Sequence, residues 1–123
     1  MTGKTDSPVI HGLYAIADSA WLAPRDMLPA VEQALLGGAG VVQYRDKHND
    51  DSTRLRLARE LADLCRRHQV ALIINDDPQL ALASGASGVH LGRDDAGMRS
   101  ARELLGSQAI IGVSCYNEAQ RAR

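Results

Sequence analysis

Three polar side chains at a spacing of two, Gln43, Arg45 and Lys47, form the group in this sequence that is best suited to chemistry. Alternate residues of an extended strand point to the same side, so all three side chains are expected to share one face. Arginine and lysine on such a face need an anionic partner, because a buried unpaired charge is costly. A guanidinium grips phosphate in a fork and an ammonium acts as a point charge, so the pattern predicts a phosphate site. The alternative is a solvated loop in which Arg45 and Lys47 pair with Asp46 and Asp50.

Two carboxylates, Asp76 and Asp95, follow successive predicted strands and are candidates for a metal site. The carboxyl ends of parallel strands meet at one edge of a sheet, so the two side chains are expected to converge there. Two carboxylates with phosphate oxygens and waters are the usual way in which proteins hold Mg²⁺. Asn75 either binds phosphate or satisfies a loop amide, and Asp95 has the alternative role of a helix cap. Asp77 is interpreted only as the cap of the next helix.

A hydroxyl and an imidazole belong to the later strands. Ser114 ends an apolar stretch and is placed to donate a hydrogen bond, although it also fits an ordinary strand end. His90 alternates with Val89 and Leu91 and faces away from them, so a packed core histidine and a catalytic one are both open. The sequence has no glycine-rich phosphate fingerprint of the known kinds.

The bulk composition is that of an ordinary globular domain: 123 residues, 45% hydrophobic and 24% charged, with a net charge of -1. The near-neutral charge and scarce aromatic residues argue against nucleic-acid binding, and no apolar run reaches membrane-spanning length. The polar residues 1–8 lack a signal-peptide core, which favours a cytoplasmic protein. We expect a flexible tail over residues 1–10, one domain over residues 11–123, and two reduced thiols, Cys65 and Cys115.

Strands and helices are expected to alternate strictly. The predicted strands cover residues 13–18, 41–46, 71–76, 88–92 and 109–114, and the predicted helices cover residues 26–36, 51–68, 78–84 and 98–105, with a further helix from Asn117. This alternation predicts a parallel sheet with crossover helices. A five-stranded doubly wound sheet suits the length, whereas a (β/α)8 barrel needs roughly 200–250 residues. Length alone therefore favours the open sheet.

Four ordered motifs resemble those of the thiamine phosphate synthase family. They are Gln43-Tyr44-Arg45-Asp46-Lys47, Ile73-Ile74-Asn75-Asp76-Asp77, Gly88-Val89-His90-Leu91-Gly92 with Asp95, and Ile111-Gly112-Val113-Ser114. The resemblance implies an α/β TIM-barrel fold, of which the chain covers the first five strands and four helices. It further implies a Mg²⁺-assisted transferase that joins a pyrimidine diphosphate to a thiazole phosphate and releases pyrophosphate.

The resemblance also implies a role for each matching residue. Gln43 through Lys47, Tyr44 and Asp46 included, would line the pyrimidine diphosphate site with help from Asn75. Asp76 and Asp95 would hold Mg²⁺, and Ser114 would lie beside the substrate. The chemistry of the residues agrees, because Arg45, Lys47 and Mg²⁺ are suited to stabilise charge on a departing diphosphate. Three further strands, with a phosphate-binding lysine and the thiazole phosphate site, are expected beyond residue 123, so activity of the chain alone is not expected.

Three rival interpretations remain open from the sequence. The thiazole tautomerase branch of the same fold should not need the full set of arginine, lysine and paired aspartates. A phospho-acceptor receiver module has the right length, but it requires a lysine where this chain has Ser114 and a pair of acids where it has only Asp18. An inactive fragment is the third. Small-molecule substrates are the expected partners, and the sequence leaves homo-oligomerisation open.

Overall fold

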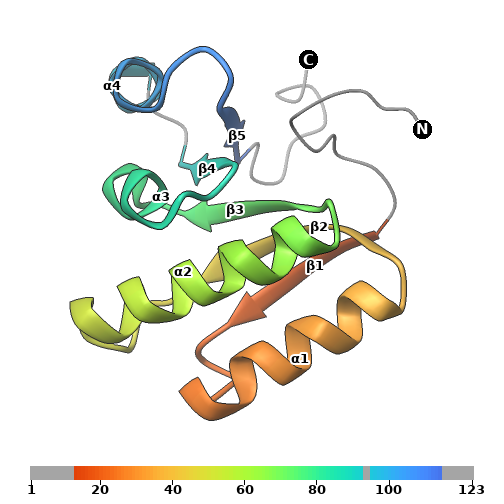
Figure 1. Ribbon diagram of the computed structural model, residues 1–123. Coiled ribbons are helices and arrows are strands. Elements are labelled where there is room, and N and C mark those ends of the chain that lie inside the picture. Colours follow the sequence, from red (N-terminus) through yellow and green to blue (C-terminus); the bar gives the residue numbers. More distant parts are fainter. Residues whose placement is uncertain (1–12, 93–94, 115–123) are drawn as a thin grey trace.

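The computed structural model describes residues 13–92 and 95–114, which form five strands and four helices in alternation (Figure 1). The strands are β1 (Leu13–Asp18), β2 (Ala39–Arg45), β3 (Ala71–Asn75), β4 (Gly88–Leu91) and β5 (Ile110–Val113). The helices are α1 (Pro24–Leu36), α2 (Asp51–Arg67), α3 (Pro78–Ser84) and α4 (Asp95–Leu105). The tail expected over residues 1–10 and the helix expected from Asn117 lie outside the described residues.

The strands form one parallel sheet in the order β1-β2-β3-β4-β5. Each helix contacts the next one along the chain, so the four helices cover a single face of the sheet (Figure 1). A doubly wound sheet instead reverses at a switch point, as in the order 2-1-3-4-5, and carries helices on both faces. The open sheet that length favoured is therefore wrong, and so is the receiver-like module, which needs that order. Consecutive units of a (β/α)8 barrel have the observed arrangement.

The main apolar core lies between the sheet and the helices. The strand residues that face outward and are fully buried there include Val42, Tyr44, Leu72, Ile74 and Val89. The helices meet them with apolar stripes at a spacing of three or four, namely Met27, Val31 and Leu35 in α1 and Leu57, Leu61 and Leu64 in α2. Cys65 belongs to the same core as a free thiol. Burial raises its pKa to about 11, which agrees with the expected inert, reduced cysteine.

Local capping explains where the helices begin. The side chain of Asp77 accepts a hydrogen bond of 3.0 Å from the backbone N–H of Leu80, so its predicted role as the cap of α3 is confirmed. Helix α1 begins at Pro24, two residues before the predicted start at residue 26, because proline suits a first position whose N–H has no partner within the helix. Pro29 consequently lies in the second turn, where it removes one intrahelical hydrogen bond.

The inner face of the sheet, opposite the helices, carries a much smaller apolar cluster. Val41, Ala71 and Ile73 are buried there, with Ile110 packed against them. Toward β1 this face is open: Tyr14 is 49% exposed and Ile16 is 58% exposed. In a closed barrel this face forms the packed interior. The described strands therefore form part of such an interior, and its exposed portion lies at β1.

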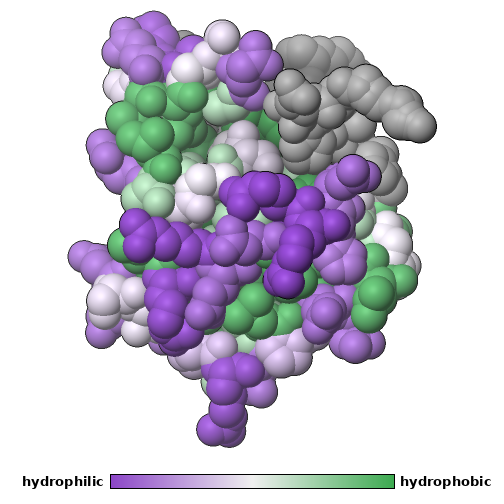
Figure 2. Space-filling model, viewed as in Figure 1, coloured by the Kyte–Doolittle hydropathy of each residue, from purple (hydrophilic) through white to green (hydrophobic). Residues whose placement is uncertain are grey.

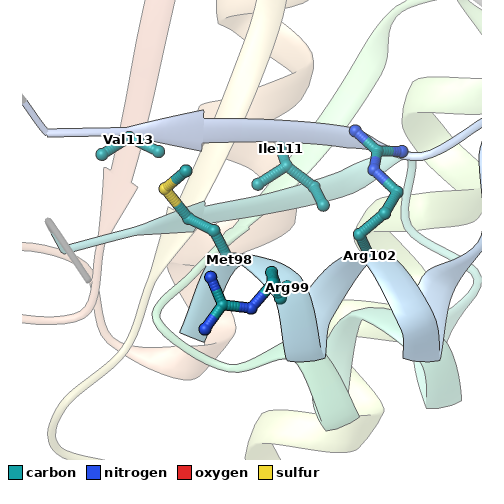
Figure 3. Close-up of a pocket in the computed structure, with 5 residues that line it drawn as sticks. All are labelled: Met98, Arg99, Arg102, Ile111 and Val113. Carbon is teal, nitrogen blue, oxygen red and sulfur yellow. The ribbon is translucent and has the colours of Figure 1, made fainter. Parts of the chain in front are cut away.

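Helix α4 covers the outer face of the sheet at β5. Met98 of α4 lies over Ile111 and Val113, and the three side chains border a shallow hollow with Arg99 and Arg102 (Figure 3). Arg102 donates hydrogen bonds of 2.8 Å and 2.7 Å to the backbone carbonyls of residues 106 and 109. These bonds fix the end of α4 to the turn that leads into β5.

The surface of the helical layer is mainly polar. Figure 2 shows hydrophilic residues across the middle of this face, over α2, with smaller hydrophobic areas toward its sides. This distribution fits the charged outer side of α2, where Arg56 pairs with Glu60 and Arg66 with Asp63. Among the described residues, no helix is both long and apolar enough to cross a membrane.

Candidate active site

A hollow of about 520 Å³ opens on the inner face of the sheet. Every strand contributes to it, and the lining residues are Tyr14, Ile16, Gln43, Arg45, Ile73, Asn75, His90, Ile110, Gly112, Val113 and Ser114. Its polar groups lie toward the carboxyl ends of the strands, where barrel enzymes carry their active sites. Four residues predicted for one site, Gln43, Arg45, Asn75 and Ser114, are therefore brought together.

A chain of hydrogen bonds crosses three strands on the floor of this hollow. The amide nitrogen of Asn75 donates to Gln43 Oε1 over 3.2 Å, and Gln43 Nε2 donates to the Tyr14 hydroxyl over 2.8 Å. Each amide orientation is thereby fixed by the next residue. Asn75 Oδ1 is buried and has no hydrogen-bond partner among the described residues. A buried acceptor of this kind is suited to a donor supplied by a ligand.

The two cations at the end of β2 pair with carboxylates on neighbouring strands. Arg45 Nη1 lies 3.2 Å from Asp18 Oδ2, as expected from a register that sets these residues side by side. Lys47 Nζ lies 2.9 Å from Asp76 Oδ2. The alternative in which Arg45 and Lys47 pair within their own loop is therefore wrong. Both cations are just over 40% exposed, so water and mobile anions reach them.

Lys47 does not share the hollow with Gln43 and Arg45, contrary to the single face that the spacing predicts. It lies beyond the end of β2, where the chain is no longer extended. It borders a second hollow, of about 250 Å³, lined by Asp46, Lys47, Asn49, Arg54, Asn75, Asp76 and Asp77. Asn75 borders both hollows and joins them. The predicted cationic group is thus divided between two adjoining spaces at the same edge of the sheet.

Asp76 has a backbone conformation that is unusual for a residue with a side chain. Its φ is +63°, and its N–H donates a 2.7 Å hydrogen bond to the carbonyl of His90 at the end of β4. Asparagine and aspartate are the side-chain-bearing residues that best tolerate this left-handed region. The turn holds Asp76 beside the strand that precedes α4. Asp95 is the first residue of α4, but its side chain lies outside what the structure describes, so its approach to Asp76 stays a prediction.

Tyr44 and Asp46 lie away from the main hollow. Tyr44 is buried in the outer core, and its hydroxyl donates a 2.5 Å hydrogen bond to Asp46 Oδ2. Asp46 also accepts from the backbone N–H groups of His48 and Asn49 and from the Asn49 side chain. Burial by itself raises the pKa of Asp46, but these hydrogen bonds outweigh it and bring the pKa below its ordinary value. Burial, reinforced by Asp46, raises the pKa of Tyr44, so its hydroxyl remains a donor.

One structural residue of this region is not evident from the sequence. Arg54 belongs to a helix with many charged residues, but its side chain is only 21% exposed and donates a 2.8 Å hydrogen bond to Asp77. This ion pair ties α2 to the loop that carries Asp76. Helical periodicity places Arg54 near the border of the polar face of α2, but it does not predict an ion pair with Asp77, which lies in the loop before α3.

Comparison with known proteins identifies the relatives of this fold and site. A family model described as thiamine monophosphate synthase matches residues 13–123. A thiamine-phosphate synthase from Nitrosococcus oceani is 52% identical over 116 residues, which cover 94% of this chain and 54% of the relative. One from Marinobacter nauticus is 50% identical over 122 residues, covering 98% of this chain and 54% of the relative.

The solved structures agree with the sequence relatives. A thiamine phosphate pyrophosphorylase from Pyrococcus furiosus is 33% identical, with a TM-score of 0.73 over 85% of this chain and 50% of that one. The chain thus spans about half the length of the relatives that it matches. The resemblance of the four motifs is confirmed, and the chain belongs to the thiamine monophosphate synthase family.

Proposed function

We propose that this chain forms the amino-terminal half of a thiamine phosphate synthase, a transferase of thiamine biosynthesis. The reaction joins 4-amino-2-methyl-5-(diphosphooxymethyl)pyrimidine to 4-methyl-5-(2-phosphoethyl)thiazole and yields thiamine phosphate and pyrophosphate. The observation that carries the proposal is the position of Arg45, Lys47 and Asp76 around adjoining polar hollows at the carboxyl edge of the sheet. The names of the curated relatives support the same reaction.

The pyrimidine diphosphate is proposed to occupy the two hollows together. Gln43 and Asn75 offer amide groups to the ring, and the buried Asn75 Oδ1 is an acceptor suited to an amino group. Arg45 and Lys47 are proposed to bind the diphosphate, with Ser114 as a further hydrogen-bond donor. Tyr44 and Asp46 would contribute indirectly, since their hydrogen bonds fix the loop that carries Lys47.

The chemical work of this site is the breaking of a carbon–oxygen bond to diphosphate. Negative charge develops on the departing oxygens, and donors already fixed at that position stabilise it. Arg45, Lys47 and Ser114 are the proposed catalytic residues for this reason. A dissociative displacement of this kind, in which the pyrimidine stabilises the cation, needs no protein nucleophile.

Magnesium is proposed to bind between Asp76, Asp95 and the diphosphate. The described side chains include no cluster of three or more histidines, cysteines or acids that would hold a metal without a ligand. Asp76 is 48% exposed, and within the part of the chain that the structure describes its side chain forms an ion pair with Lys47 alone, so its carboxylate is accessible. This donor set fits Mg²⁺, which usually takes one or two carboxylates and completes its shell with phosphate oxygens and water. The ion supplies charge neutralisation at the diphosphate when bound.

A chain that supplies the missing strands tests the proposal directly. We define the completed chain as residues 1–123 joined to the part of the N. oceani relative that lies beyond its match, a join justified by 52% identity. We expect it to form thiamine phosphate from the two substrates with Mg²⁺. A folded completed chain that makes no product would contradict the proposed function. A location in the cytoplasm and assembly into oligomers remain predictions.

Replacing Arg45 by lysine keeps the charge but removes the fork. In the completed chain, R45K is expected to raise KM for the pyrimidine diphosphate about tenfold, because lysine cannot bind phosphate through two parallel hydrogen bonds. KM for the thiazole phosphate should stay within about twofold, since Arg45 is proposed to contact only the first substrate. The matched control is Arg56→Lys, which alters an exposed ion pair on α2. An equal rise in both KM values would indicate a folding defect instead.

Removing the Tyr44 hydroxyl tests the support of the Lys47 loop. We expect Tyr44→Phe to lower the free energy of unfolding of the completed chain by about 2 kcal/mol at pH 7, the scale of a hydrogen bond to a charged group. The folded-state pKa of Asp46 is depressed, so the carboxylate stabilises the fold above its ordinary pKa of about 4, and this contribution is fully lost only as the pH falls through the depressed folded-state pKa. Asp46 therefore remains a carboxylate in the folded chain at pH 3, and the difference between Tyr44→Phe and wild type should be largely retained there.

Urea unfolding at pH 7 and pH 3 measures this difference. Tyr14→Phe is the matched control, because it removes a hydroxyl whose partner is the neutral amide of Gln43. Its smaller effect should be the same at both pH values. A Tyr44→Phe effect no larger than that of Tyr14→Phe at either pH would show that the charge of the Asp46 carboxylate adds nothing to this hydrogen bond.

A further inference from the structure

His90 and Ser114 form a side-chain pair on the inner face at the later edge of the main hollow. His90 Nε2 lies 2.8 Å from Ser114 Oγ, which is hydrogen-bond distance, and both residues line the hollow. In the sheet, His90 stands beside Asn75 on one side and beside Gly112 on the other. The imidazole thus occupies the space between the proposed ring-binding amides and the hydroxyl proposed to contact diphosphate.

The position of the imidazole depends on the glycine next to it. A Cβ atom at Gly112 would lie 2.9 Å from His90 Nδ1, closer than real Cβ atoms approach a neighbour. Any side chain at residue 112 would therefore push the ring away from its place against β5. Gly112 keeps the imidazole within reach of Ser114, which explains a glycine in the middle of a four-residue strand.

The direction of the hydrogen bond decides what Ser114 offers to the hollow. A serine hydroxyl has one proton and two acceptor lone pairs. When the ring donates to Oγ, the hydroxyl proton is free to bind another acceptor. When Oγ donates to the ring, Ser114 presents only lone pairs, as an activated nucleophile does. The other groups proposed to meet the diphosphate, Arg45 and Lys47, are cationic donors, so a polyanionic substrate fits the first arrangement.

We propose that His90 is a positioning residue that donates Nε2–H to Ser114 Oγ and turns the Ser114 proton toward a substrate phosphate oxygen, with Gly112 holding the ring in place. The inference rests on the proposed function, because it supposes a diphosphate in the hollow. His90 itself acts through Ser114 and needs no contact with the reacting atoms. The pair therefore works as one unit, and its loss should lower kcat more than it raises KM for the pyrimidine diphosphate.

Substitutions in the completed chain test this unit. His90→Leu should lower kcat about tenfold, the scale of one hydrogen bond made in the transition state, while KM for the pyrimidine diphosphate changes less. His90→Gln retains an N–H donor and should recover most of the loss. Gly112→Ala keeps every functional group and should still lower kcat, whereas Gly37→Ala, at an ordinary φ of -82° in the α1 cap, is the matched control.

A double-mutant cycle shows whether His90 acts through Ser114. If it does, His90→Leu should cause no further loss of kcat in a Ser114→Ala background. Independent losses that multiply, a His90→Leu variant with wild-type kcat, or a His90→Gln variant as slow as His90→Leu would each overturn the proposal. These outcomes require an active wild type, so they are distinct from failure of the proposed function itself.

A spectroscopic measurement tests the proton without turnover. In the ¹⁵N-histidine spectrum of the completed chain, the signal lost on His90→Gln identifies the ring of His90. We expect Nε2 to carry the proton. A neutral ring protonated at Nδ1 would mean that Ser114 donates to His90, and this result would overturn the proposal even in a chain with no synthase activity.

Discussion

Residues 1–123 expressed alone are expected to form no thiamine phosphate, whereas the completed chain forms it readily. Five strands cannot close an eight-stranded barrel. The described strands leave the inner face open toward β1, where Tyr14 is 49% exposed and Ile16 is 58% exposed. Without an opposite wall, the proposed thiazole phosphate substrate would not be held against the proposed pyrimidine substrate, and loss of such positioning costs on the order of 10³-fold or more in rate.

The same open face predicts self-association. Among the described residues, β1 has only β2 as a neighbour, so its other edge offers backbone groups for further strand pairing. The exposed apolar side chains beside that edge favour association as well. Light scattering should therefore find residues 1–123 as oligomers or aggregates, and the completed chain as a defined species. The product assay is run on both chains at equal concentration. A monodisperse, cooperatively unfolding 123-residue monomer with turnover near that of the completed chain would show that the second half of the barrel is dispensable.

Replacing Asp76 by asparagine is expected to have the largest effect of any single substitution. Stabilisation of transition-state charge by a metal ion amounts to several kcal/mol, so D76N in the completed chain should lower kcat/KM by about 100-fold or more. The Mg²⁺ concentration needed for half-maximal rate should rise as well. Asparagine is the appropriate replacement because it tolerates the φ of +63° at this residue, where alanine would be strained.

Two controls separate loss of a metal ligand from loss of structure. Asp63→Asn makes the same chemical change in an exposed ion pair of α2 and should leave the rate and the Mg²⁺ dependence unchanged. Titration calorimetry of Mg²⁺ with pyrophosphate should detect ternary binding to the completed chain and a weaker signal with D76N. An unaltered Mg²⁺ requirement in D76N would reject Asp76 as a ligand.

The sequence predicts the elements of this fold far better than their arrangement. Strand β1 and helix α3 have the predicted bounds, because an apolar run that ends in Asp18 marks the first and the pair Asp77 and Pro78 marks the second. Helix α4 begins at Asp95, three residues before the predicted start at residue 98. The order of the strands could not be derived from periodicity, since a doubly wound sheet and a barrel have the same alternation. Only the family motifs favoured the barrel.

In the site, the sequence likewise predicts the direction of side chains within a strand better than it predicts contacts between strands. A spacing of two correctly puts Gln43 and Arg45 on one face, because both lie within a regular strand. It fails for Lys47, which lies past the end of β2. The partners Asp18 and Asp76 come from neighbouring strands, and their choice depends on a register that no local pattern encodes. The His90–Ser114 contact likewise depends on how β4 and β5 align.

The nearest-neighbour order of the strands also bears on how the chain acquires its structure. Among the described residues, every strand pairs only with those just before and after it, and each helix packs on its sequence neighbours. Contacts between consecutive units close shorter loops than contacts between the two ends of the chain would, and a chain leaves the ribosome at about 5–20 residues per second from its amino end. The unit made by β1, α1 and β2 is therefore able to assemble while later strands are still being synthesised. Folding of this half is expected to proceed from the amino end. In a complete (β/α)8 barrel, β1 would gain its second neighbouring strand only when the barrel closes.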